Sequence, residues 1–191
     1  MRKFKNLLNV FLIVTFVSCT SITVFAETIH YSQNPNIVQQ AKTQWCWAAS
    51  AEMAAKSIYP NTNRTQWDGV AQVKGSSSVN LPASSIECTT ATNYICYNNA
   101  NFKVEYFPWN MSSIRRDIMD YQKPLIFLAG YYDNYGNRNG GHFVVGDAVY
   151  EYSNYFRYRD PWDSTTHWVD YQAFCNGNYN SRQYEETVFA R

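Results

Sequence analysis

Three apolar runs in the second half of the chain predict β-strands. They cover residues 124–132 (PLIFLAGYY), 142–152 (HFVVGDAVYEY) and 155–161 (YFRYRDP), and they are rich in branched and aromatic residues between polar or glycine-containing turns. Pro161 ends the last run, because proline has no N–H to donate to a strand ladder. The closing stretches TTHWVDYQAFC and ETVFAR predict a short helix and a last strand. We therefore expect an antiparallel sheet in this half.

The first half of the chain shows helical patterns instead. The stretch WAASAEMAAKSIY is rich in alanine and free of glycine and proline, which predicts a helix that begins at Cys46. A weaker pattern predicts a short helix near residues 65–73, and the Leu-Pro pair at 81–82 opens another. Apolar positions at helical spacing predict an amphipathic helix over 110–122, with Asn110 as its N-cap. Because helices precede strands, we expect an α+β fold, with a helical part packed against an antiparallel sheet.

The N-terminal segment has the features of a secretory signal peptide. A basic start, MRKFK, is followed by an apolar run at residues 7–17 and then by small residues. The apolar run is too short for a membrane-spanning helix, which needs about 20 residues. We predict a signal peptide at 1–26, one folded domain at 27–191 and secretion to the extracellular space. Lipoprotein processing at Cys19 is the alternative.

The charge of the chain after signal cleavage excludes some classes of partner. Cleavage removes three of the 16 basic groups and none of the 15 acidic ones, which leaves a net charge of −2. Nucleic acids and anionic membranes attract proteins through clustered Lys and Arg, and no such cluster remains. We therefore expect no nucleic-acid partner and no membrane partner. We expect a monomer that recognises a protein or peptide substrate through a defined site.

Four cysteines remain after signal cleavage: Cys46, Cys88, Cys96 and Cys175. An oxidising compartment permits disulfides among them. On an unbroken helix Cys88 and Cys96 would lie about 12 Å apart, whereas a disulfide needs about 4.4–6.8 Å between Cα atoms. Either the helix breaks between them, or one of the two pairs with Cys175. The chain has no CxxC motif and its histidines are scattered, so we expect no metal and no cofactor.

The stretch TQWCWAAS places Cys46 at the start of the predicted helix. Unpaired N–H groups and the helix dipole at such a position favour a thiolate, which is the nucleophilic form. Catalysis also needs a base, a group that orients the base and donors for an oxyanion. The candidate base is His142, which follows two glycines at the head of an apolar strand. His30 and His167 lie in less rigid settings.

Asp160 is the candidate that orients His142. If residues 142–150 and 155–160 form a hairpin, the strand end that carries Asp160 returns to within about two residues of the level of His142. This reasoning does not separate Asp160 from Asp163. Asp147 is a weaker rival, because it lies farther from His142 along the same strand.

Two glutamines precede Cys46 and offer side-chain N–H donors. Gln40 stands six residues before the cysteine and Gln44 two before it. Either amide, together with the backbone N–H of Cys46, would stabilise negative charge that develops on a substrate oxygen.

Together these residues resemble the papain-like cysteine peptidases. The resemblance rests on the order Gln40, Cys46, His142 and Asp160, and on the motifs WCWAA, GGHFVV and DPW. It covers essentially the whole chain after the signal peptide and is greatest for a compact bacterial branch of secreted peptidases and avirulence-type effector proteases. It implies a nucleophilic Cys46, His142 as general base and then acid, Asp160 as its orienting partner and Gln40 as oxyanion donor. It also implies an active site in a cleft between the helical part and the sheet part.

The chain departs from papain in two respects that bear on function. Thr-Gln-Trp replaces a glycine-rich segment before the cysteine, and aspartate replaces asparagine as the third catalytic residue. No inhibitory prodomain is visible in the 19 residues between position 27 and the cysteine. Substrate preference and activation therefore do not transfer from the resemblance.

The function that this reading favours is a secreted cysteine endopeptidase that acts through an acyl-thioester intermediate. A papain-like peptidoglycan amidase or acyltransferase is one alternative. A catalytically silent secreted binding module, with some of the 16 tyrosines and six tryptophans in a ligand groove, is another. Trp45 and Trp47 either pack in the core or shield the histidine–carboxylate contact. The segment 131–141 is either a mobile lid or a long hairpin connection.

Overall fold

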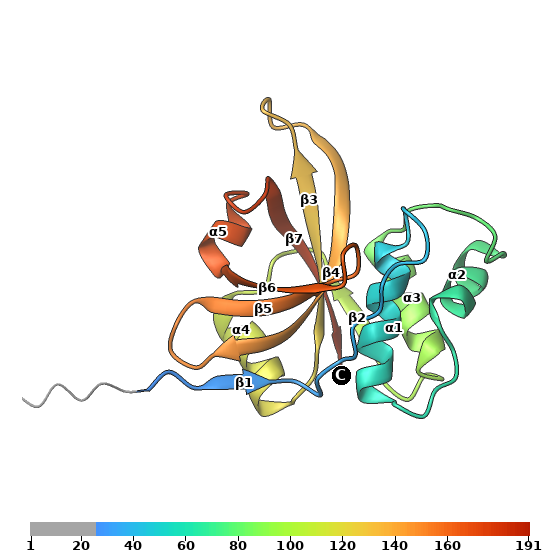
Figure 1. The fold of residues 1–191 in the computed structure, drawn as a ribbon, viewed down its shortest axis with the longest axis horizontal. Coiled ribbons are helices and arrows are strands. Elements are labelled where there is room, and N and C mark those ends of the chain that lie inside the picture. The colour runs from blue at the N-terminus through green and yellow to red at the C-terminus, as the bar shows by residue number, and fades with distance from the viewer. Residues whose placement is uncertain (1–25) are drawn as a thin grey trace, which may run out of the picture.

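The computed structural model of the chain describes residues 26–191 (Figure 1). The predicted signal peptide, residues 1–26, lies outside the described residues except for Ala26, so it stays a prediction. Within the described part, no helix is both long and apolar enough to cross a membrane. A helical part lies at the right of Figure 1 and a sheet part at the left.

Three helices form the helical part: α1 (Cys46–Ile58), α2 (Gln66–Lys74) and α3 (Ser85–Ile95). The later two begin with capping boxes, in which Asp68 accepts from the N–H of Thr65 and Glu87 accepts from the N–H of Ser84. Gly75 ends α2 in the left-handed region, with φ 78°, where glycine has no Cβ to clash. The alanines of α1 allow close packing, and most of this helix is buried.

Seven strands of the described residues form one antiparallel sheet. They are β1 (Ile29–Tyr31), β2 (Phe102–Glu105), β3 (Leu125–Tyr132), β4 (Arg138–Tyr150), β5 (Tyr155–Asp160), β6 (Thr165–Asp170) and β7 (Arg182–Ala190). Their order is β2-β7-β3-β4-β5-β6, and β1 also pairs with β4. Two short elements complete the fold: α4 (Met111–Arg115), which continues as a π-helical turn over Arg116–Asp120, and α5 (Tyr171–Cys175).

Alternate residues of β3 belong to two different hydrophobic cores. Ile126 and Leu128 pack in the core that contains α1 and α3, whereas Phe127 packs in the core that contains α4 and α5. Because successive side chains of a strand point to opposite faces, β3 is buried on both sides. Helix α1 packs on β4 across the first core. This contact joins the helix that begins with Cys46 to the strand that carries His142.

The predicted α+β fold is confirmed. Helices α1, α2 and α3 form in the segments whose patterns predict them, and strands β3, β4 and β5 coincide with the three apolar runs. The predicted amphipathic helix at 110–122 also forms, with Asn110 accepting a hydrogen bond from the N–H of Ser113 as its N-cap. It ends at Asp120, and its last turn is π-helical.

Three short strands differ from the sequence expectation. TTHWVD is strand β6, and only the YQAFC that follows it is helical. Strand β1 lies in the segment 27–45, which shows only a polar composition, and β2 at 102–105 has no clear signal either. Each of the two has three or four residues, too few to show a reliable period of two.

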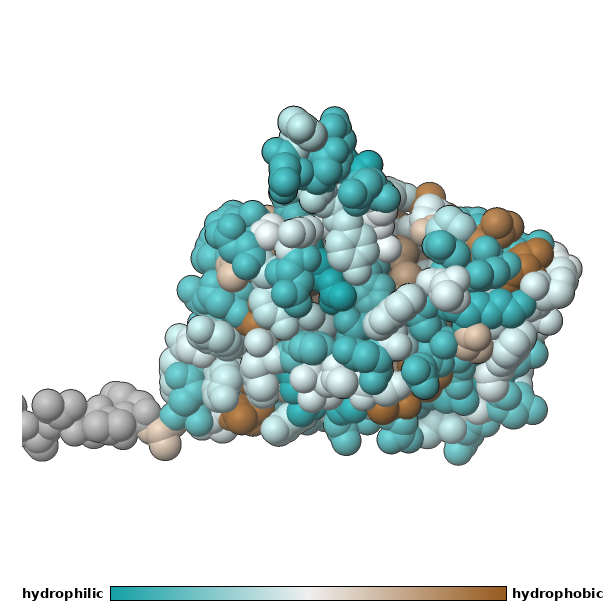
Figure 2. Space-filling model, turned by 45° about the horizontal axis from the view of Figure 1, so that its top comes forward, coloured by the Kyte–Doolittle hydropathy of each residue, from teal (hydrophilic) through white to brown (hydrophobic). Residues whose placement is uncertain are grey.

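Residues 131–141 form a hairpin connection. Strands β3 and β4 extend into this segment and leave only residues 133–137 as the turn, where Asp133 accepts from the N–H groups of Tyr135 and Asn137. The hairpin projects above the body of the molecule in Figure 1, and its tip is hydrophilic in Figure 2. The lid alternative gains no support from this arrangement.

The four cysteines of the described residues are all free thiols. Helix α3 runs unbroken through Cys88 to Ile95, and Cys96 is its C-cap. The spacing argument against a bridge between Cys88 and Cys96 therefore agrees with the structure. The alternative bridge to Cys175 is absent as well.

Candidate active site

Cys46 is the first residue of α1, with Trp45 as N-cap and no acidic side chain in the first turn. The residue is partly exposed. Among the described residues, no group accepts a hydrogen bond from the N–H of Cys46. Unpaired N–H groups and the helix dipole favour negative charge at the start of a helix. The position therefore suits an anionic nucleophile and leaves one backbone donor for a substrate oxygen.

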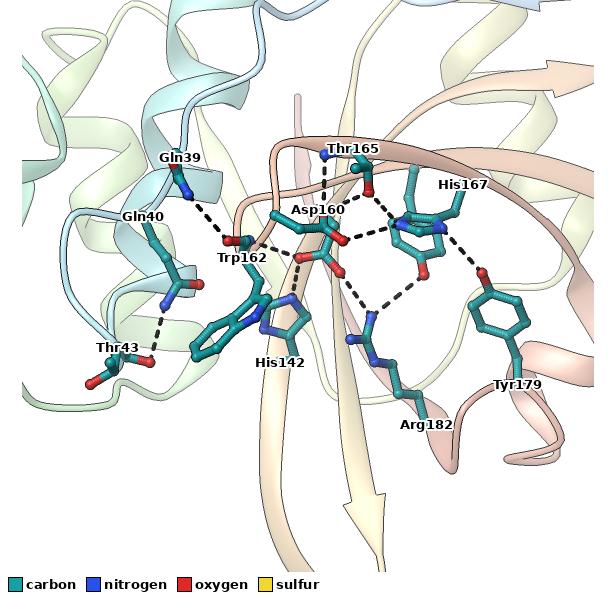
Figure 3. A network of polar contacts seen from close by, with 12 residues as sticks. Gln39, Gln40, Thr43, His142, Asp160, Trp162, Thr165, His167, Tyr179 and Arg182 are labelled. Atoms are coloured by element: carbon teal, nitrogen blue, oxygen red, sulfur yellow. Dashed lines mark hydrogen bonds and ion pairs between the residues drawn. The ribbon is translucent and has the colours of Figure 1, made fainter.

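His142 lies on β4, opposite Ala129 of β3, and is only 5% exposed. Its Nε2 atom lies 2.6 Å from Oδ1 of Asp160, at the end of β5 (Figure 3). The register explains this contact, because Val145 pairs with Arg159 and the next pair along the hairpin brings Asp160 within two residues of His142.

Asp160 is held by three further groups besides the imidazole, as Figure 3 shows in part. Nη1 of Arg182 lies 2.9 Å from its Oδ2 atom, and the N–H of Trp162 donates to its Oδ1 at 2.9 Å. The N–H of Ser164 donates to its backbone carbonyl, which fixes the turn after β5. Burial disfavours the carboxylate, but the contacts with His142, Trp162 and Arg182 hold the pKa of Asp160 well below its usual range.

Cys46 lies near enough to His142 to influence the pKa of its imidazole. Burial by itself would lower the pKa of His142, but the hydrogen bonds and charges of Asp160 and Cys46 raise it to about 9. The raised pKa keeps the imidazole protonated at neutral pH.

Cys46 and His142 line the same cavity, which has a volume of about 970 Å³. The helical part contributes Trp47 and residues 82–86 to its walls, and the sheet part contributes residues 138–143 of β4 and Glu186 of β7. The site is therefore a cleft between the two parts of the molecule. Its floor brings a nucleophile and a base together from elements about 96 residues apart in sequence.

The rival acidic residues lie elsewhere. Asp147 is fully buried and forms ion pairs with Arg157 and Arg159, each at 2.6 Å. Asp163 accepts hydrogen bonds from Thr165 and lies 3.8 Å from His167.

The other two histidines have local partners of their own. Nε2 of His30 lies 3.3 Å from Glu151, and Nε2 of His167 lies 2.6 Å from the hydroxyl of Thr165. Of the three histidines, only His142 lines the cavity.

Gln40 does not line this cavity, although its loop is close to the site. Its Nε2 atom donates to the carbonyl oxygens of Lys42 at 2.9 Å and Thr43 at 3.0 Å, while its own N–H donates to the carbonyl of Pro161. Both amide hydrogens are therefore engaged. Gln44 does line the cavity. The role of Gln40 as oxyanion donor stays a prediction.

Two residues that belong to the site were not singled out from the sequence. Trp162 is 56% exposed and lines the cavity, while its N–H holds Asp160. Its place directly after the Asp-Pro pair was the available signal. No sequence signal pointed to Arg182, because its contact with Asp160 depends on where β7 lies in the sheet. Trp45 and Trp47 are both fully buried in the core, as the packing interpretation predicts.

One group of side chains near the site has ligand atoms close enough to hold a metal ion. Asp160, Asp163 and His167 place one such atom each within 4.8 Å of one another. Both oxygens of Asp160 already have partners, however, and one partner is the positively charged Arg182. A cation would have to displace that guanidinium, so the arrangement favours the ion pair.

No family model matches the chain, and no curated protein matches it. Solved structures do match. The chain is similar to a double glycine motif protease from an AMS/PCAT transporter in complex with its leader peptide, with 13% identity, a TM-score of 0.54, and 85% of this chain and 99% of that chain covered. It is also similar to xylellain, a cysteine protease from Xylella fastidiosa, with 10% identity, a TM-score of 0.59 and 86% of each chain covered. The protein therefore has the α+β fold of the papain-like cysteine proteases.

Proposed function

We propose that this protein is a secreted cysteine endopeptidase that uses Cys46, His142 and Asp160. The single observation that carries the proposal is the position of His142, which binds the Asp160 carboxylate at 2.6 Å and lines the same cleft as Cys46. Cys46 and His142 line the cleft, and Asp160 holds His142 from outside its lining. This is the arrangement that a thiol nucleophile, its base and an orienting group require.

In the first half of the reaction, the thiolate of Cys46 attacks the carbonyl carbon of a peptide bond. The carbonyl oxygen gains negative charge, and the N–H of Cys46 is the donor that we assign to it. His142 then gives its proton to the leaving amine as the C–N bond breaks. The product is an acyl-thioester on Cys46 and a free amine.

In the second half, a water molecule attacks the thioester carbonyl. His142, now neutral, takes a proton from this water, and the C–S bond breaks to release a carboxylic acid and the thiolate of Cys46. Asp160 stays ionised throughout and stabilises the imidazolium in each half. Its low pKa supports this role.

Two further features support a peptide substrate and an exported enzyme. One of the similar structures is a protease in complex with a leader peptide, so a fold of this type can accept an extended peptide. The first 26 residues have the composition of a signal peptide. The mature enzyme would then act outside the cell on a protein or peptide.

The decisive experiment compares Cys46→Ser with Cys175→Ser on an unfolded protein substrate. Cys175 is the matched control, because it is also a free, partly buried thiol but lies on α5. We expect cleavage by Cys46→Ser to fall by about a thousandfold or more, and cleavage by Cys175→Ser to stay at the parental rate. Parental cleavage by Cys46→Ser would refute the proposal.

Labelling gives an independent test of the same assignment. An epoxide-type cysteine peptidase inhibitor should add once, on Cys46, since Cys88 and Cys96 are fully buried and burial raises the pKa of Cys175. His142→Ala should slow this labelling strongly. Release of muropeptides from purified cell wall without any proteolysis would instead favour the amidase alternative.

A further inference from the structure

We propose that the cleft contains a subsite for a basic side chain, lysine or arginine, and that the carboxylate of Glu186 is its charged end. The proposal rests on the peptidase function above and adds a substrate class to it. It starts from the charged side chains that line the cavity, which are Arg138, His142, Glu185 and Glu186. Three of these four are already paired inside the protein.

A β-bulge brings two consecutive glutamates to the cavity. Leu128 of β3 pairs with Glu186, but the next residue, Ala129, pairs with Tyr184, so Glu185 is an extra residue in β7. In a regular strand, neighbouring side chains point to opposite faces, whereas a bulge changes the direction of one of them. Both Glu185 and Glu186 line the same cavity as a result.

Glu185 is not available to a substrate. Arg138 of β4 holds it with two bonds, from Nε to Oε1 at 2.8 Å and from Nη2 to Oε2 at 2.9 Å, and the hydroxyl of Tyr132 donates to Oε1 at 2.7 Å. Gly130 leaves the space for this carboxylate, since a Cβ there would lie 2.1 Å from Oε1. The charges of Arg138 and Glu185 therefore neutralise each other at the cavity wall.

Glu186 has no such partner. Its side chain is partly buried and lines the cavity, and within residues 26–191 it makes no hydrogen bond and no ion pair. The remaining cation of the wall, His142, is paired with Asp160. Glu186 is near enough to Arg138 to help raise the pKa of that guanidinium, but two carboxylates then face one arginine. One negative charge is thus left in excess in a partly desolvated groove, where attraction to a cation is stronger than in open water.

The walls next to Glu186 suit the rest of a long basic side chain. Leu128 pairs with Glu186 across the sheet, and Ala83 and Ile86 line the cavity from the helical part. Ile86 is 55% exposed, and Figure 2 shows hydrophobic side chains on the upper face of the helical part. Lysine and arginine cover apolar surface with their methylene stems while the charged end reaches a polar partner. An acidic side chain would meet repulsion at the same place.

The test uses short peptides that differ only in one residue, which is Lys, Arg, Gln or Glu in turn at each position around the scissile bond. We expect one position at which Lys and Arg give kcat/KM about tenfold higher than Gln, with Glu poorer than Gln. In Glu186→Gln the ratio of the Lys peptide to the Gln peptide should fall to about one. In Glu186→Lys the preference should reverse in favour of Glu.

Glu105→Gln is the matched control. This glutamate lies on β2, next to β7, and is absent from the cavity wall. Its substitution removes the same charge and should leave the Lys-to-Gln ratio unchanged. Raising the salt concentration should reduce the ratio for the parent, because screening weakens a partly exposed charge pair.

A binding measurement separates this proposal from the peptidase proposal. Calorimetry with Cys46→Ala and the same peptides should show tighter binding of the Lys peptide, and the double variant with Glu186→Gln should lose the difference. Cys46-dependent cleavage without any charge preference, or a preference that survives Glu186→Gln, would overturn the subsite and leave the peptidase intact. Absence of Cys46-dependent cleavage together with equal binding of all peptides would overturn both.

Discussion

Arg182 binds the oxygen of Asp160 that His142 does not use. The guanidinium Nη1 lies 2.9 Å from Oδ2, while Nε2 of His142 lies 2.6 Å from Oδ1. Both the arginine and the aspartate are largely buried, with side-chain exposures of 16% and 3%. A carboxylate in this position needs a counter-charge that a neutral amide would not need, and Arg182 supplies it. We therefore assign Arg182 a positioning role, since it acts through Asp160.

We expect Arg182→Gln to lower kcat/KM by up to about 100-fold, because a misplaced orienting group costs rate without contacting the substrate. The loss of a positive charge near His142 should also move the alkaline limb of the pH–rate profile upward. Arg182→Lys keeps the charge and should leave this limb in place. If Arg182→Gln lowered the melting temperature but left the alkaline limb of the pH–rate profile unchanged, the role of Arg182 would be structural only.

The raised pKa of His142 predicts a specific pH dependence of activity. The imidazolium donates the proton to the leaving amine, so kcat/KM should fall as the pH rises through about 9, the pKa of this group. Stopped assays with a fluorogenic peptide from pH 5 to pH 10.5 would measure this limb. A limb near pH 6.5 would mean that Asp160 and Cys46 do not raise the pKa of His142 in solution.

Stability should follow the same titration. The pKa of His142 is about 9 in the folded protein and 6.5 for an unperturbed histidine. A group with a raised pKa contributes stability that is fully present below the unfolded value and is lost toward the folded value. The free energy of unfolding should therefore decline between pH 6.5 and 9. Denaturant titrations of the parent and of His142→Gln should show this decline in the parent alone.

Asp147 provides a contrast with Asp160. It is fully buried and pairs with Arg157 and Arg159, away from the cavity. We expect Asp147→Asn to lower the free energy of unfolding by about 3 kcal/mol or more, since two largely buried cations lose their partner. The rate of labelling at Cys46 by a thiol reagent, measured well below the unfolding midpoint, should stay at the parental value. A large loss of labelling would place Asp147 in the catalytic machinery.

Gly146 of β4 should be intolerant of a side chain. A Cβ at this position would lie 2.3 Å from Cε2 and 2.7 Å from Cζ of Phe127, whose ring is fully buried. We expect Gly146→Ala to destabilise the protein by about 2 kcal/mol, as overpacking of a core does. Gly140→Ala is the matched control, since its Cβ would meet Tyr131 at an ordinary 3.5 Å. Equal melting temperatures for the two variants would contradict the packing argument.

The parts of the fold that local pattern controls could be predicted from the sequence. The alanine-rich run after Cys46 and the apolar runs that became β3, β4 and β5 are long enough to show their periods. Counting residues along one hairpin also places Asp160 near His142, although it does not separate Asp160 from Asp163. In each case the neighbours in space are neighbours, or near neighbours, in sequence.

The parts that depend on long-range pairing could not be predicted. Strand β2 pairs with β7, and the salt bridge of Arg182 to Asp160 requires β7 to lie beside β3. No local pattern specifies which of several strands becomes a neighbour. The hydrogen-bond partners of Gln40 could not be predicted either, because its side-chain amide donates to backbone carbonyls of its own loop. Residue spacing does not show whether such carbonyls or a substrate oxygen accept from this amide.

The place of β7 has a consequence for when the protein can act. This strand follows the other strands of the described residues along the chain, yet it inserts between β2 and β3. It brings Glu186 to the cleft and Arg182 to Asp160. A chain in which β7 has not yet paired would lack the guanidinium that holds the Asp160 carboxylate. On the proposed peptidase function, activity would then appear only after β7 has paired, which couples the onset of catalysis to completion of the sheet.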